Sequence, residues 1–124
     1  MGNEKIQKRA LRFAIDLTKF IFRLKGNRDL QILLNQLLRS GTSVGANLEE
    51  ADSAVSKKDF IHKISIAKKE ARETKYWLII LKEADLLKRQ ENLTNLDELL
   101  DEVNQIIKII GAIHSKSKAS LVYK

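Results

Sequence analysis

Apolar residues recur along the chain at alternating steps of four and three, which places them on one face of successive α-helices. The first such segment covers about residues 5–25, and it ends at Gly26-Asn27 because both residues tolerate the left-handed conformation that terminates helices. Its apolar face consists of Ile6, Ala10, Phe13, Leu17, Phe20 and Leu24. The second segment covers about residues 30–54. Its apolar face consists of Leu30, Leu34, Leu37, Gly41, Val44, Leu48 and Ala51.

Two further helices follow the same spacing. Ser56 with Asp59 three residues later is typical of a helix N-cap, and it opens a third helix at about residues 57–87. The core face of this helix consists of Phe60, Ile64, Ala67, Ala71, Thr74, Leu78 and Leu81. The fourth helix is predicted at about residues 95–113, followed by a frayed, Lys- and Ser-rich tail at residues 114–124. Its inward positions are Leu96, Leu100, Val103, Ile107 and Ile110, and its stripe is widened by Leu99, Ile106 and Ile113.

Four helices joined by short connections predict an all-α fold, an antiparallel up-down-up-down four-helix bundle. A length of 124 residues is that of one domain, so we assign residues 1–124 to a single bundle. The absence of proline and the few aromatic residues agree with helices packed on helices. The absence of cysteine favours a cytoplasmic location. Asp16 and Lys19 interrupt the apolar stretch near the N-terminus, which argues against a signal peptide and a membrane span.

Some residues of the second and third helices do not fit a simple stripe. Gly41 and Gly45 each cost about 1 kcal/mol against alanine inside a helix. Close approach of another backbone is the usual compensation. Ile66, Trp77 and Ile80 lie off the core stripe, so the third helix has a second apolar surface as well as the one facing its own bundle.

The formal charge of +7 is unevenly distributed. Residues 1–25 carry seven basic and two acidic side chains, and residues 56–90 carry ten basic and five acidic ones. On the first helix a basic row lies away from the core face: Lys5, Lys8, Arg12, Lys19 and Arg23. On the third helix a second row lies beside the core stripe: Lys57, Lys68, Arg72, Lys75 and Lys82. Any single lysine is explained by a solvated surface, but two rows of one sign favour salt-sensitive binding of phosphates without base readout.

The sequence contains no arrangement typical of catalysis. His62 and His114 are far apart, and the pair formed by Asp59 and His62 would supply at most half of a metal site. The Glu-x-x-His pairs of di-iron bundles, phosphate-binding glycine loops and nucleophile elbows are missing, so we expect no enzyme, metal or cofactor. An acidic cluster at the end of the second helix could hold a divalent cation, but solvation or pairing with a basic residue is favoured. It consists of Glu49, Glu50 and Asp52.

Two stretches resemble a known family. Residues 39–51, RSGTSVGANLEEA, and residues 58–78, KDFIHKISIAKKEARETKYWL, closely resemble the bacterial four-helix-bundle family named after proteins encoded in intervening sequences of 23S ribosomal RNA genes. The resemblance is strong across about residues 35–82. The family pattern often has glycine at the position of Ala51, which leaves the end of the second helix open.

The resemblance implies a bundle that assembles into a ring, typically a homopentamer, with a positively charged surface suited to nucleic acid. In such a ring the second apolar surface of the third helix, formed by Ile66, Trp77 and Ile80, would serve the subunit interface. Gly41 and Gly45 would allow close approach of helices between subunits or, equally, within one bundle. The accessory proteins of diversity-generating retroelements look like relatives; they form such rings and work with a reverse transcriptase and its RNA. No catalytic residues are known for the family.

We therefore expect a non-enzymatic homo-oligomer that binds nucleic acid, RNA in the first instance, through one or both basic rows. The alternative is an oligomeric scaffold that binds an acidic protein partner. Neither hypothesis involves a membrane.

Overall fold

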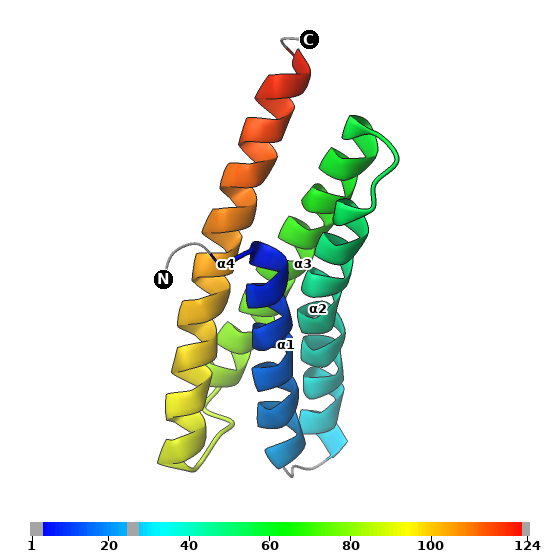
Figure 1. Ribbon diagram of the computed structural model, residues 1–124. Helices are drawn as coiled ribbons and strands as arrows, with labels where there is room; N and C mark the ends of the chain where they lie inside the picture. The colour runs from blue at the N-terminus through cyan, green and yellow to red at the C-terminus, as the bar shows by residue number, and fades with distance from the viewer. Residues whose placement is uncertain (1–3, 25–27, 123–124) are drawn as a thin grey trace.

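The computed structural model describes residues 4–24 and 28–122 of the chain. Within these residues the chain forms four α-helices: α1 (Ile6–Arg23), α2 (Arg28–Asp52), α3 (Lys57–Glu83) and α4 (Gln90–Val122). Consecutive helices run in opposite directions (Figure 1), and both α1 and α3 pack on α2 and on α4. No close backbone contact joins α1 to α3 or α2 to α4 in the described parts of the chain. The predicted all-α, up-down-up-down four-helix bundle is confirmed.

The core is formed by the apolar faces of the four helices. All six predicted positions of α1 are buried, and Leu17 and Ala10 have no solvent exposure. On α4 the prediction was partly wrong, because Leu99 and Ile106 are buried whereas Leu100 and Ile107 are only partly buried. The sequence has apolar residues at both members of each adjacent pair. Periodicity alone therefore allowed two orientations of α4, and packing against α1 and α3 selects one of them.

One polar contact crosses the core. Thr74 of α3 donates a hydrogen bond from Oγ1 to Oγ of Ser40 on α2 at 2.9 Å, and both residues are fully buried. Ser40 Oγ in turn donates to the carbonyl oxygen of Leu37 at 3.3 Å. The hydrogen bonds satisfy both hydroxyl groups, so burying them does not leave an unpaired polar atom in the core.

The helix ends follow the cap signals where these exist. Ser56 Oγ accepts a hydrogen bond from the backbone N–H of Asp59 at 3.0 Å, which confirms the predicted N-cap of α3. The same helix ends at Glu83 rather than near residue 87, because Asp85 adopts a positive φ of 55°. Aspartate tolerates this conformation better than most residues, but it is a weaker stop signal in a sequence than glycine. The predicted stop at Gly26-Asn27 lies outside the described residues.

The bounds predicted for α4 were wrong at both ends. The helix begins at Gln90, because Leu93 packs against the core and draws one more turn into the helix. It continues to Val122, where a frayed tail from residue 114 was expected. No proline interrupts this segment. As a result α4 and the start of α3 extend beyond the first turn of α1 (Figure 1).

None of the helices is both long enough and apolar enough to cross a membrane, as far as the described residues go.

Candidate nucleic-acid interface

The basic row of α1 is exposed, but acidic groups lie close to parts of it. Arg12 forms a two-point ion pair with Glu4, in which Nη2 lies 2.7 Å from Oε1. Its hydrogen bonds and charge lower the pKa of Glu4. Lys19 and Arg23 line a hollow together with Asp16, Glu98 and Glu102. Lys5 and Lys8 complete the row, and they line another hollow together with Glu4, Glu49 and Asp52, so both ends of the row have acidic neighbours.

The basic row of α3 runs along the side of that helix that faces α4. Lys57, Arg72 and Lys82 are exposed, and Lys68 and Lys75 are half-buried. At the end of the row, Lys82 forms an ion pair with Asp97 of α4 at 2.9 Å, and the hydrogen bond raises the pKa of Lys82. None of the other four members forms an ion pair with a described residue.

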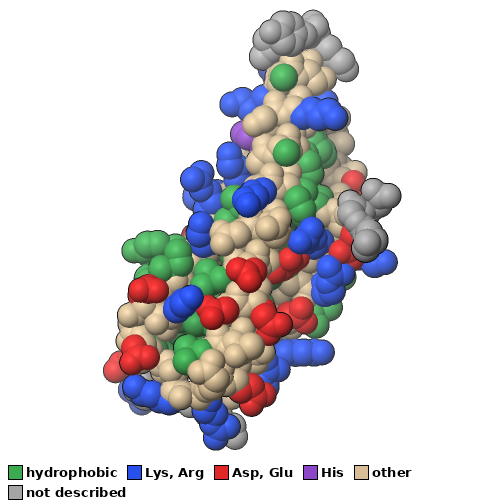
Figure 2. Space-filling model, turned by 90° about the vertical axis from the view of Figure 1, so that its left-hand side faces the viewer, with side chains coloured by type: hydrophobic (Ala, Val, Ile, Leu, Met, Phe, Trp, Pro, Cys, Tyr) green, Lys and Arg blue, Asp and Glu red, His purple; other side chains and the backbone are tan. Residues whose placement is uncertain are grey.

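The two halves of α4 carry opposite charges. Residues 90–104 contain five acidic side chains and no basic one, whereas residues 105–122 contain three lysines and no acidic residue. Figure 2 looks onto this side of the molecule, and basic side chains predominate towards the C-terminal end of α4 while acidic ones gather lower down. The three lysines are Lys108, Lys116 and Lys118. Sequence reasoning missed them as part of a surface because two of them were assigned to a frayed tail.

An ion pair joins the other side of α4 to α1. Arg9 of α1 binds Glu102 of α4 through two hydrogen bonds, from Nε to Oε2 at 2.7 Å and from Nη2 to Oε1 at 2.9 Å. Both side chains are partly buried, and the hydrogen bonds raise the pKa of Arg9. This pair holds the acidic half of α4 against α1.

His114 lies within the basic half of α4. It is half-buried, and burial lowers the pKa of the imidazole, with further lowering by the positive charges of Lys118 and Lys68. The two lysines belong to different helices, so positive charge from both α3 and α4 acts on this imidazole.

The two glycines of α2 face α1 inside one bundle. A Cβ at position 41 would lie 2.1 Å from Cδ2 of Leu17, and one at position 45 would lie 3.7 Å from backbone and side-chain atoms of Ala10. Close helix packing within the chain thus accounts for Gly41 and brings α1 near Gly45. A role of either glycine between subunits stays a prediction.

The second apolar surface of α3 is partly covered by its own bundle. Trp77 packs against the core, and its Nε1 donates a hydrogen bond to Glu73 at 3.0 Å. Ile66 and Ile80 are half-buried. Their proposed place in a subunit interface stays a prediction.

The acidic cluster of α2 pairs with other helices. Glu50 binds Lys63 of α3 at 2.8 Å, and Asp52 accepts a hydrogen bond from Gln7 of α1 at 3.2 Å. Glu49 is exposed. No group of three or more His, Cys, Asp or Glu side chains that could hold a metal ion occurs within the described residues.

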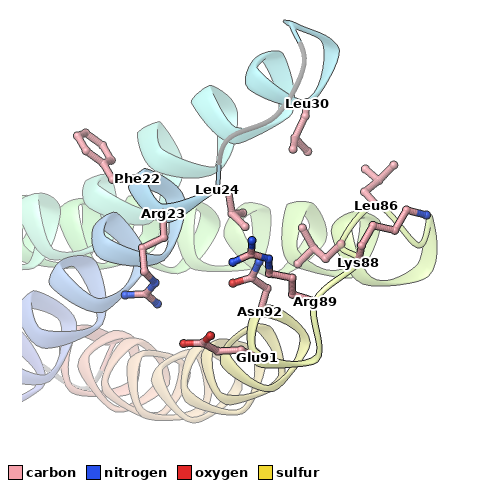
Figure 3. Close-up of a pocket in the computed structure, with 10 residues that line it drawn as sticks. Phe22, Arg23, Leu24, Leu30, Leu86, Lys88, Arg89, Glu91 and Asn92 are labelled. Carbon is pink, nitrogen blue, oxygen red and sulfur yellow. The ribbon is translucent and has the colours of Figure 1, made fainter.

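A hollow lies at the opposite end of the bundle from the basic half of α4. Its lining includes Leu24 and Leu86 together with the charged Arg23 and Arg89. Figure 3 shows Arg89 close to Leu24, while Phe22, which also lines the hollow, points away from the other side chains.

The chain matches the family described as 23S rRNA-intervening sequence protein over residues 3–111. A crystal structure of a protein from Bacteroides thetaiotaomicron, described as having unknown function and as belonging to the S23 ribosomal protein family, is 34% identical and superposes with a TM-score of 0.76. The similarity covers 89% of this chain and 98% of that one. No curated protein matches the chain.

Proposed function

We propose that this chain, which belongs to the 23S rRNA-intervening sequence protein family, is a non-enzymatic homo-oligomer that binds nucleic acid, RNA in the first instance, through basic helix faces. The observation that carries the proposal is the exposure of the two basic rows in the folded chain. Lys68 and Lys75 are half-buried, and the other eight members are exposed. Arg12 and Lys82 are the members that form ion pairs with described residues.

Such rows are suited to the phosphate backbone. Each lysine or arginine that neutralises a phosphate releases a condensed counterion, so affinity falls steeply as salt is added. Reading a base sequence requires side chains placed against base edges, and regular helix faces of long, flexible lysines provide charge without such fixed contacts. Binding by backbone and shape follows.

Exposed apolar side chains support self-association. Leu11, Ile15 and Phe22 are 56%, 45% and 73% exposed and follow one another along the outer face of α1. The partly exposed Trp77 and Ile80 lie on α3, which makes no close backbone contact with α1 in the described chain. Two different apolar surfaces on separate helices suit a head-to-tail contact between copies, and such contacts form rings when the rotation between subunits closes.

The first test is the mass of the purified protein by size-exclusion chromatography with light scattering, with and without a structured RNA at low and moderate salt. We expect an oligomer of about five chains, as the family resemblance implies, and an RNA complex whose affinity falls by orders of magnitude with salt. An oligomer that ignores RNA at low salt would contradict the nucleic-acid part of the proposal. A monomer at micromolar concentration would contradict the ring.

A protein scaffold is the second candidate, and the exposed stripe of α1 is the observation that favours it. Phe22 in particular is 73% exposed, so it does not belong to the core of its own bundle and is available to a partner. A pull-down from nuclease-treated cytoplasm separates the two functions. A partner protein that stays bound after nuclease treatment supports the scaffold, and loss of all partners supports nucleic acid.

A further inference from the structure

The basic residues of the bundle differ in how far acidic groups already neutralise them. Ion pairs within the described residues engage Arg9 and Arg12 of α1, Arg39 of α2, and Lys63 and Lys82 of α3. The cations that have no such partner and lie along α3 and α4 belong to the first two-thirds of α3 and the second half of α4. The basic row of α3 and the end of α4 contribute Lys57, Lys68, Arg72, Lys75, Lys108, Lys116 and Lys118, while Lys58 and Lys69 of α3 also have no such partner but lie outside the row.

The charge of α4 explains why the two ends of the bundle differ. Its acidic first half lies beside the ends of both basic rows: Glu98 and Glu102 share a hollow with Lys19, and Asp97 and Asp101 share another with Lys75. A phosphate approaching there would meet carboxylates as well as lysines. Its basic second half lies beside the first part of α3, where no acidic residue of α4 is present among residues 105–122.

The pKa of His114 reports the same positive location. Burial lowers this pKa most, and the positive charges of Lys118 of its own helix and Lys68 of α3 lower it further. Among the described residues these are the charged groups that act on it, and α1, the other helix packed on α4, contributes none.

We propose that the nucleic-acid backbone binds along the α3–α4 basic face, defined by Lys68 and Arg72 of α3 and Lys108 and Lys118 of α4, and not along the row of α1. The inference rests on the proposed function. It adds which surface of the bundle contacts the nucleic acid, and that the end of α4 forms part of that surface. From Lys57 to Lys75 the row of α3 rises about 27 Å at 1.5 Å per residue. That length matches roughly eight base-pair steps of a DNA duplex at 3.4 Å each, and a larger number of the more closely spaced steps of an A-form RNA duplex.

The test reverses three charges on this face and measures binding to a labelled double-stranded RNA of about 20 base pairs, longer than the face. In the variant Lys68→Glu, Arg72→Glu and Lys118→Glu, we expect the affinity to fall at least 100-fold at low salt. The slope of log affinity against log salt should decrease by roughly two to three, since each lost phosphate contact removes about 0.7–0.9. Circular dichroism checks the fold, and the same positions changed to glutamine provide a milder variant if the reversed one fails to fold.

A matched control carries the same change in net charge elsewhere. Lys58, Lys69 and Arg28 are exposed and belong to neither row. Their joint replacement by glutamate should weaken binding less than about tenfold, through the long-range field alone, and should leave the salt slope unchanged.

Three results would overturn the assignment, and they are distinguishable. Equal losses in the control and in the α3–α4 variant would show that net charge decides binding. A larger loss when Lys5, Lys8 and Lys19 are reversed would place the nucleic acid on α1. Absence of RNA binding by the unmodified protein would overturn the proposed function itself, and the assignment with it.

Discussion

Replacing Gly41 with alanine tests whether the close approach of α1 to α2 determines the packing of the bundle. The added Cβ would lie 2.1 Å from Cδ2 of Leu17, far inside van der Waals contact, while Cγ2 of Thr74 would lie at an ordinary 3.7 Å. Leu17 is fully buried, so its side chain can only withdraw by displacing other core atoms. Such overpacking costs about 1–3 kcal/mol. Alanine regains about 1 kcal/mol of helix propensity, so we expect the free energy of unfolding to fall by about 0–2 kcal/mol.

The chain supplies two matched controls for this substitution. A Cβ at Gly45 would lie 3.7 Å from its nearest neighbours in Ala10, an ordinary contact, and one at Gly111 would meet nothing within 4 Å. Both replacements keep the gain in helix propensity without the clash. Each should therefore raise the free energy of unfolding by about 1 kcal/mol. The Gly41→Ala variant should lie about 1–3 kcal/mol below the Gly111→Ala variant.

The free energies are measured by urea unfolding followed by circular dichroism, at one chain concentration because self-association would add to the apparent stability. In a Leu17→Val background, which removes the clashing Cδ2, the Gly41→Ala replacement should become stabilising. If Gly41→Ala raises stability as much as Gly111→Ala in the unmodified chain, then α1 and α2 do not approach each other as closely as described, and the reasoning is refuted.

Three further predictions concern single contacts. Thr74→Val should lower the free energy of unfolding by about 1 kcal/mol, because Ser40 loses its buried hydrogen-bond donor. Adding Ser40→Ala should recover most of that loss. Urea unfolding measures both variants, and a double variant no more stable than Thr74→Val would contradict the pairing. A double-mutant cycle with Arg9→Met and Glu102→Gln should give a coupling free energy of about 0.5–1 kcal/mol, because solvent screens this partly exposed pair. The coupling should decrease as salt is added, and a coupling of zero would contradict the two-point ion pair. The pKa of His114 is lowered in the free protein, and a bound phosphate opposes that lowering, so RNA affinity should rise as pH falls below about 6.5. Titrations of RNA binding at several pH values measure this rise, and His114→Asn should abolish it. A pH profile that the substitution leaves unchanged would place the phosphate elsewhere.

The fold could be predicted because the information that determines it is local. The spacing of Ile6, Ala10 and Phe13 identifies the core face of α1 without any knowledge of its neighbours, and all three are buried as expected. The cap formed by Ser56 and Asp59 is likewise a property of four consecutive residues, and it is confirmed. The family identified from residues 39–51 and 58–78 is confirmed by the match over residues 3–111.

The candidate surface could be predicted only in part, because its composition depends on which helices lie side by side. Each basic row was visible on its own helix, but the sequence does not show that the acidic first half of α4 lies beside the ends of both rows. Nor does it show that Lys108 and Lys118 continue the row of α3. That depends on α4 remaining helical beyond residue 113, where polar residues predicted a tail.

The end of α4, which the sequence did not predict to be helical, matters for the proposed function. Without the last turns of α4, α3 offers a single row of lysines, which a solvated helix face would explain equally well. With those turns helical, cations from two helices converge around His114, and the positive charge has no internal carboxylate to balance it. An anionic partner is the simplest way to offset such repulsion. Shortening the chain at residue 113 should therefore weaken RNA binding more than it lowers the helicity of residues 4–112, and a truncated chain that binds RNA as well as the full one would contradict a role for the end of α4.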